Sequence, residues 1–231
     1  MPKPKSALCQ KNNPPTGEKG GNKMEGLKMA ASYSWNCNTA KRLKVCEKLH
    51  DFILGKVKTE ETAKEILELL VPYKFYCAIA KTNNLFEVFS PAVISFYWRG
   101  WPKTFKSPSG ETNFFHNHTV AAIAYSQPLE KIDLKHMNEC LASCGQIKKI
   151  SKNCFAVEYR PVVREKDGLV FGKPKIAKLT NQLKLKAKKN DSVSFHYGNA
   201  AEIISPAEAR QLNETTEKIL QKFNAQKKRT P

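Results

Sequence analysis

The sequence has no long hydrophobic run. The longest apolar stretch, 92–98, is interrupted by Ser95, and it falls far short of the roughly 20 apolar residues that a membrane-spanning helix needs. The segment from Met1 to Lys23 is rich in lysine, proline, glycine and asparagine and has no apolar core, so it fits neither a secretory signal nor a membrane anchor. We therefore predict a soluble, cytoplasmic protein without a membrane span.

Acidic residues are scarce. The chain has 21 Asp and Glu residues against 39 Lys and Arg residues, which leaves a formal net charge of +18. A surplus of this size attracts anionic partners, and nucleic acid, anionic lipid and acidic proteins all fit that description. The seven cysteines are irregularly spaced and follow no secretory signal, which favours reduced thiols over a disulfide framework.

The signatures of common catalytic sites are also missing. The chain has no glycine-rich phosphate loop, no Gly-x-Ser-x-Gly turn, no His-Glu-x-x-His pair and no dinucleotide-binding fingerprint. Each of these patterns places a reactive or phosphate-binding group at a defined turn or helix. Their absence favours a binding protein over an enzyme.

Length and composition support an ordered protein of two domains. The chain has 231 residues, of which 41% are hydrophobic, enough to bury a core in each domain. We predict an α+β protein in which a mainly helical domain precedes a small β-barrel and a C-terminal helix. The predicted boundaries are a disordered basic tail at 1–27, the helical domain at 28–135, the barrel with its helix at 136–225, and a second basic tail at 226–231.

Several segments have helical periodicity. Apolar residues recur at helical spacing between Thr39 and Leu54, and a second stripe runs from Ala63 to Leu70 before Pro72. Pro91 is a favourable first residue for a further helix. Near the C-terminus, Ser205 and Glu208 form a capping box ahead of a long apolar stripe, which predicts the most clearly marked helix of the chain.

Between these helices the sequence changes character. Short segments with β-branched and aromatic residues follow Pro128, and Asp167-Gly168 is a turn signal between two of them. Small strands at short intervals are typical of a compact barrel or meander. The predicted strands are 145–150, 154–159, 169–171, 175–179 and 193–196.

The first candidate site combines Cys140 and Cys144 with His196. A thiolate and an imidazole on one side of a small barrel would be good ligands for iron or zinc. From spacing alone, the favoured interpretation is two small buried cysteines and a hydrogen-bonded strand histidine. A thiol redox pair of Cys140 and Cys144 is a third, weaker interpretation, because a disulfide requires the chain to turn between them.

Three segments share a pattern of a cysteine-leucine start, a valine-rich strand that ends in histidine and glycine, and an acidic, alanine-rich C-terminal helix. They are Cys140 to Ile150, Cys154 to Tyr159, and Asp191 to Ala209. In this pattern, over about 138–223, the chain resembles the HypC/HupF family of nickel-iron hydrogenase maturation chaperones. The preceding helical part is similar to that of an uncharacterised prokaryotic family that carries such a barrel, and this similarity implies no activity.

The resemblance implies an OB-like β-barrel with a C-terminal helix and a chaperone-like, protein-binding function. In that family the cysteine carries iron transiently and contacts a protein partner, either a maturation scaffold or a metalloenzyme precursor, while the histidine assists. Cys140 and His196 occupy these two positions. The chain differs from the family in that Cys140 is internal, Cys144 replaces a proline and Asn190 replaces a glycine.

A second candidate is the pair His116 and His118 in the sequence Phe-His-Asn-His. In an extended chain both side chains would lie on one face, as half of a metal site requires. The favoured interpretation is a pair of loop or partner-contact histidines. Cys37 and His50 could complete such a site, although no pattern in the sequence links them.

The third candidate is a lysine-rich segment without an acidic residue between Gly168 and Asn190. On a barrel, it could follow a phosphate backbone, with Phe171 or Tyr197 as a stacking surface. This is the alternative function, a basic OB-like nucleic-acid-binding protein, although a solvated charged face is the favoured interpretation. The residues concerned are Lys173, Lys175, Lys184, Lys186, Lys188 and Lys189.

Overall fold

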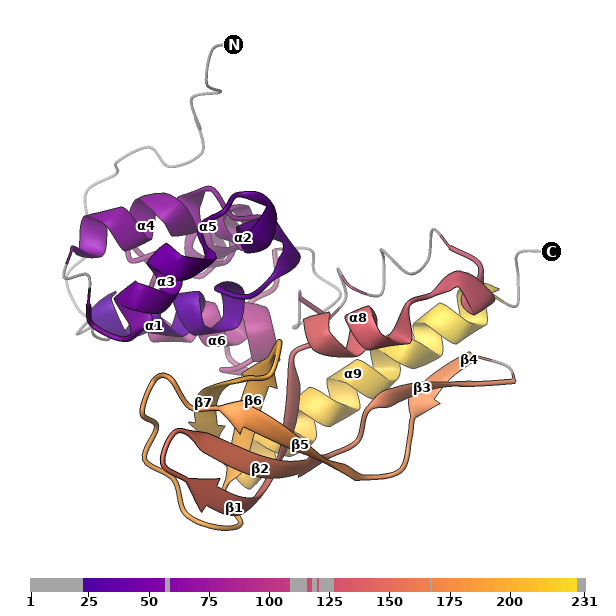
Figure 1. The fold of residues 1–231 in the computed structure, drawn as a ribbon. Helices are drawn as coiled ribbons and strands as arrows, with labels where there is room; N and C mark the ends of the chain where they lie inside the picture. Colours follow the sequence, from indigo (N-terminus) through magenta and orange to yellow (C-terminus); the bar gives the residue numbers. More distant parts are fainter. Residues whose placement is uncertain are drawn as a thin grey trace.

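The computed structural model describes residues 23–56, 59–108, 116–117, 120, 127–166 and 168–227. It has an α+β fold in which a helical N-terminal part precedes a closed β-barrel and a long C-terminal helix (Figure 1). This confirms the predicted fold class. The first helices are α1 (Lys23–Ser34), α2 (Asn38–Arg42), α3 (Cys46–Ile53), α4 (Glu60–Glu68), α5 (Pro72–Thr82) and α6 (Pro91–Arg99).

Helix α6 has strong start and stop signals in its own sequence. Ser90 accepts a hydrogen bond from the Val93 backbone amide, and Pro91 occupies the first turn. Gly100 ends the helix with φ 71°, a left-handed conformation that glycine adopts without steric cost. The helix start predicted at Pro91 is confirmed.

Two predictions for the helical part need correction. The single helix predicted from Thr39 to Leu54 is divided into α2 and α3, because Lys44 between them has a positive φ of 56°. Residues 23–27, which we assigned to the N-terminal tail, form the start of α1. A Cβ atom at Gly26 would lie 1.7 Å from the Phe89 carbonyl oxygen, so the burial of α1 depends on a close backbone approach there. The rest of the predicted tail, 1–22, lies outside the described residues.

The barrel strands pair in the order β1-β2-β5-β7-β6, and β6 returns to β1. Neighbouring strands are antiparallel except for the parallel pair β5 and β7. This is the five-stranded Greek-key arrangement of an OB-like barrel. The barrel strands are β1 (Ser143–Ser151), β2 (Cys154–Tyr159), β5 (Lys175–Thr180), β6 (Ser192–His196) and β7 (Asn199–Ile204).

A separate two-stranded sheet joins β2 to β5. It consists of β3 (Val162–Glu165) and β4 (Gly168–Phe171), which lie beside the C-terminal helix in Figure 1. The five strands predicted from the sequence are all present, as β1, β2, β4, β5 and β6. We did not predict β3 or β7.

The C-terminal helix α9 spans Pro206–Lys227 and begins with the predicted capping box. The Ser205 amide donates to Glu208 Oε2 at 2.7 Å, and the Glu208 amide donates to Ser205 Oγ at 3.2 Å. The helix includes Gln226 and Lys227, which we had assigned to a basic tail, and 228–231 lie outside the described residues. The buried stripe is Leu212, Thr216, Ile219, Leu220 and Phe223.

A short helix, α8 (Leu134–Cys140), follows the 3-10 turn Leu129–Lys131 and leads directly into β1. The sequence did not predict α8, and the domain boundary that we placed between 135 and 136 falls inside it. In the view of Figure 1, α8 lies alongside α9. Its last residue is Cys140, which therefore has a defined position at the entrance to the barrel.

The helical part and the barrel share one hydrophobic core. Leu27 and Trp98 belong to the same buried cluster as Ala201, Ile204 and Ile219. Helix α1 contacts β6 and β7, and α6 contacts α9. The junction between the two parts is consequently a packed interior rather than a linker. Of the helices in the described ranges, none is long and apolar enough to cross a membrane.

Candidate metal centre

Cys140, His196 and His116 come together at this junction. One possible ligand atom from each residue lies within 4.8 Å of the other two. Cys140 ends α8, His196 ends β6, and His116 lies in a helical turn of the chain between α6 and α8. The structure therefore unites the two residues of the first candidate with one residue of the second.

The His196 ring is fully buried, and its two nitrogens have different environments. Nδ1 donates a hydrogen bond to the Tyr33 carbonyl oxygen at the end of α1. Because a carbonyl oxygen only accepts, Nδ1 carries the proton and Nε2 retains its lone pair. The Cys140 backbone also interacts with the ring and raises its pKa. Nε2 is buried and has no hydrogen-bond partner among the residues that the structure describes, so its lone pair can serve as a ligand.

The His116 ring has the same arrangement. Its Nε2 donates to the Cys140 carbonyl oxygen and lies 3.9 Å from the Cys140 sulfur. Its Nδ1 is buried and has no hydrogen-bond partner among the residues that the structure describes. Metal-binding histidines usually donate one ring N–H to a carbonyl or carboxylate and ligate with the other nitrogen. His196 meets this description. In His116 the nitrogen near the Cys140 sulfur is the one that donates to the carbonyl, so a shared metal would require this ring to turn or to give up that hydrogen bond.

Burial keeps the whole cluster uncharged near neutral pH. Loss of hydration lowers the pKa of His196 to about 4 and also lowers the pKa of His116 well below its usual value. Burial raises the pKa of the Cys140 thiol to about 11, and a hydrogen bond with Tyr197 opposes this effect in part. Neutral imidazoles are the form that binds metals, whereas the thiol must lose its proton on binding.

These residues fit a soft or borderline metal ion. Thiolate sulfur and imidazole nitrogen are ligands that iron, zinc and copper accept. Two unpartnered buried nitrogens are a cost to a folded protein unless something binds them. The cluster is therefore a chemically consistent candidate for a three-ligand metal centre.

Aromatic rings hold the two histidines in place. The Trp98 ring centroid lies 4.1 Å from that of His116 and 4.7 Å from that of His196. The Tyr33 ring stacks on the Trp98 ring, and the two ring centroids are 4.6 Å apart. Trp98 Nε1 donates to the Tyr76 hydroxyl at 2.8 Å. The sequence does not predict this contact, because aromatic density does not reveal which side chain a ring will face.

Tyr197 covers the cluster on the side of α8. It is only 8% exposed, and its hydroxyl contacts the Cys140 thiol and lies 3.4 Å from His136 Nδ1. His136 Nε2 in turn accepts from Asn38 Nδ2 at 3.0 Å. Tyr197 is consequently not the exposed stacking surface that we considered for nucleic acid.

Asn117 positions the segment that contains Cys140. This fully buried side chain accepts from the Ala142 amide at 2.9 Å and donates to the Ala142 carbonyl at 3.0 Å. It also donates to Thr216 Oγ1 of α9 at 2.9 Å. Asn117 thus ties the start of β1 to α9 beside His116. Sequence analysis missed this role, although a polar residue between two histidines was a visible signal.

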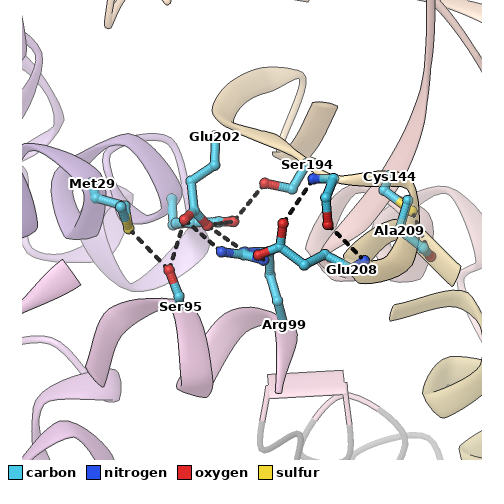
Figure 2. Close-up of polar contacts among 10 residues, drawn as sticks. Met29, Ser95, Arg99, Cys144, Ser194, Glu202, Glu208 and Ala209 are labelled. Atoms are coloured by element: carbon cyan, nitrogen blue, oxygen red, sulfur yellow. Dashed lines mark hydrogen bonds and ion pairs between the residues drawn. The ribbon is translucent and has the colours of Figure 1, made fainter. Parts of the chain in front are cut away.

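A buried charge network centred on Glu202, shown in Figure 2, is linked to the cluster through Tyr33. Glu202 of β7 accepts two hydrogen bonds from Arg99 of α6, at 2.6 and 2.7 Å, and one from Ser95 at 2.6 Å. The Tyr33 hydroxyl also donates to Glu202, at 2.8 Å, while the carbonyl of the same residue binds His196. Arg99 further contacts Glu208 at 2.8 Å. The network therefore joins the helical part, the barrel and α9 at the candidate metal centre.

The other sequence candidates lie elsewhere. The Cys144 thiol faces α9, where it contacts the Ala209 carbonyl at 3.4 Å and Asn213 Oδ1 at 3.5 Å, and Cys144 is not in the cluster. His118 lies outside the described residues. The six lysines are all exposed; one precedes β5, one lies on β5 and four lie between β5 and β6. They are Lys173, Lys175, Lys184, Lys186, Lys188 and Lys189.

Comparison with known proteins identifies one family. Residues 82–230 match a family of unknown function, DUF6390. This range contains all three cluster residues as well as the whole barrel and α9. Neither the curated proteins nor the solved structures include a match to the chain.

Proposed function

The chain belongs to this family, DUF6390, and we propose that it is a chaperone-like module that binds a protein partner and holds iron through Cys140, with His196 assisting. The observation that carries the proposal is the cluster itself. Cys140 and His196 are brought within reach of each other and of His116, and both rings keep an unpartnered buried nitrogen. The HypC/HupF resemblance, together with an OB-like barrel that ends in a helix, supports the same class of function.

The helical part has a specific place in this proposal. In the family that the barrel resembles, the chaperone meets its partners as a small separate protein. Here Tyr33 of α1 and Trp98 of α6 contact the histidine rings directly. The helical part therefore supplies, within one chain, part of the surface that covers the iron. The external partner would be a maturation scaffold or a metalloenzyme precursor that receives it.

Metal content tests this proposal. We would purify the protein anaerobically, measure bound metals by elemental analysis, and compare Cys140→Ala and His196→Ala with the native sequence. Cys144→Ala is the matched control, because its thiol is also buried but faces α9. We expect iron in the native protein and the control and its loss in the two cluster variants. Equal iron in all four proteins, or none in any, would contradict the proposal.

Nucleic-acid binding is the second candidate function. The observation in its favour is the group of six exposed lysines between β4 and β6 in a chain of net charge +18. Binding by phosphate contacts weakens steeply with salt. A titration of a single-stranded oligonucleotide at two salt concentrations separates the two candidate functions. Loss of affinity at high salt and in lysine variants would favour nucleic-acid binding over the iron-holding function.

A further inference from the structure

The three candidate ligands can supply only one negative charge. Histidine binds a metal as a neutral imidazole and cysteine binds it as a thiolate, so His116, His196 and Cys140 together carry a charge of −1. The polar contacts of these side chains within the described ranges are with backbone carbonyls, with Tyr197 and with one another. None of those contacts is with a carboxylate.

The acidic residues of the neighbouring network do not supply a second ligand charge. Glu202 is linked to the cluster through Tyr33, but Arg99 binds both of its carboxylate oxygens. Arg99 also pairs with Glu208, which gives this network a net charge of −1, but within the described ranges neither carboxylate contacts Cys140, His116 or His196. Glu139 precedes Cys140 in the chain, and its side chain is exposed. The ligand charge at the centre is therefore the single thiolate.

This charge restricts what the centre can hold. A bare divalent ion with three such ligands would leave one uncompensated positive charge beside two histidines that are 7% and 0% exposed. An unpaired buried charge costs several kcal/mol. We infer that the centre holds a metal species of net charge +1, either Cu(I) or a divalent ion such as ferrous iron together with one small anion. The inference rests on the proposed function, because it takes Cys140 and His196 as ligands.

Both sources of this charge agree with the ligand chemistry. Cu(I) accepts thiolate and imidazole ligands, and three ligands complete its coordination. A tetrahedral divalent ion with three protein ligands has a fourth position, which the anion would occupy. The two sources can be distinguished because only the divalent ion requires the anion.

The test is an anaerobic titration of the whole protein with Co²⁺, a spectroscopic substitute for ferrous iron, with and without azide. A parallel titration uses Cu(I) in competition with a chelator. We expect azide to tighten Co²⁺ binding about tenfold or more and to leave Cu(I) binding unchanged. Tight Cu(I) binding with weak Co²⁺ binding in both conditions would support the charge inference with Cu(I) as the source of the charge, and it would overturn the assignment of iron in the proposed function.

The variant His116→Cys provides the matching change in ligand charge. Its second thiolate would neutralise a divalent ion, so we expect Co²⁺ to bind it equally well with and without azide. Circular dichroism would establish that the His116→Cys variant folds. If the variant does not fold, the effect of azide on Co²⁺ binding by the native protein decides between the outcomes. Hydroxide formed from a metal-bound water would also supply the anion, and it would release a second proton besides that of the thiol. Equal, tight Co²⁺ binding by the native protein in both conditions, with release of the thiol proton only, would overturn the charge inference alone. Failure of the native protein to bind either metal under any condition would overturn the proposed function as well.

Discussion

At the scale of single residues, the carboxylate of Glu202 carries an unusual number of contacts. Arg99, Ser95 and Tyr33 all donate to it from the helical part of the chain. Removing one partner of a buried ion pair leaves the other charge buried without a counter-charge. The free energy lost is then larger than the net contribution of the intact pair to stability. The fold therefore depends on both partners being present.

We predict that Arg99→Leu lowers the free energy of unfolding by about 3–5 kcal/mol, measured by urea denaturation. The control is Glu68→Ala, which removes the exposed pair with Lys64 at 3.8 Å and should cost less than about 0.5 kcal/mol. A loss for Arg99→Leu as small as that of the control would show that the network contributes little. The double variant Arg99→Leu/Glu202→Leu should recover part of the loss, because it leaves no charge behind.

Single residues also show where prediction of the site stops. Cys140 and His196 were selected through a resemblance, and His116 through its spacing from His118. Spacing along the chain suggested that His116 pairs with its neighbour, whereas the structure places it against Cys140, 24 residues away. That contact depends on how α6, α8 and β6 pack, and no local pattern encodes this packing.

At the scale of secondary-structure elements, α9 depends on a reciprocal cap. Ser205 and Glu208 each bind the backbone amide of the other, and Glu208 also accepts from Arg99. The start of α9 is therefore linked to the buried network as well as capped. The Arg99 contact lowers the pKa of the Glu208 carboxyl, against the opposing effect of burial.

We predict that Ser205→Ala lowers the free energy of unfolding by about 1 kcal/mol, measured by thermal or urea denaturation. Ser205→Asp keeps an oxygen acceptor at the cap position, so its stability should stay close to that of the native protein. If both variants lose the same amount, the hydroxyl is not acting as a cap.

The elements that the sequence predicts correctly have strong local signals. Helix α9 combines a capping box with a periodic stripe, and β2 alternates with Phe155 and Val157 buried. The missed elements lack such signals. Strand β7 reads Asn-Ala-Ala-Glu-Ile-Ile, with weak β-formers in its first half, and it forms because β6 pairs with it. Helix α8 has only seven residues after its cap at Asp133, about two turns, which is too short for a periodic stripe.

At the scale of the whole molecule, stability and the site are coupled through the two histidines. Both are buried and neutral, with a pKa of about 4 for His196 and a lowered pKa for His116. In the unfolded chain a histidine has a pKa near 6.5. The unfolded chain therefore takes up more protons below pH 6.5, and the stability of the metal-free protein is lost as pH falls from there towards the folded pKa.

We predict that the free energy of unfolding of the metal-free protein falls by about 2 kcal/mol between pH 7 and pH 5.5, measured by urea denaturation. Most carboxylates take up protons below about pH 5.5, so the histidines dominate the change in stability between pH 7 and pH 5.5. His116→Gln should remove about half of the pH dependence, because one of the two histidines remains. The same slope in this variant and in the native protein would show that His116 does not titrate as its burial implies.

The whole molecule also explains why the site lies where it does. The helical part and the rest of the chain contribute different groups to the site. Helix α8 and strand β6 supply the Cys140 thiol and the His196 imidazole. Helices α1 and α6 supply the Tyr33 carbonyl and the Trp98 ring, which contact His196. A bound metal would consequently connect the two parts. The central claim is therefore that Cys140, His196 and His116 bind one metal ion together.

X-ray absorption at the metal edge tests this claim most directly, on protein loaded with one equivalent of zinc in the presence of azide, because a divalent ion at this centre is expected to need one small anion. The account predicts one sulfur neighbour at about 2.3 Å and two imidazole nitrogens at about 2.0–2.1 Å. In Cys140→Ala the sulfur contribution should disappear, while Cys144→Ala should give the native spectrum. A zinc environment without sulfur, or the same sulfur signal in Cys140→Ala, would contradict the account.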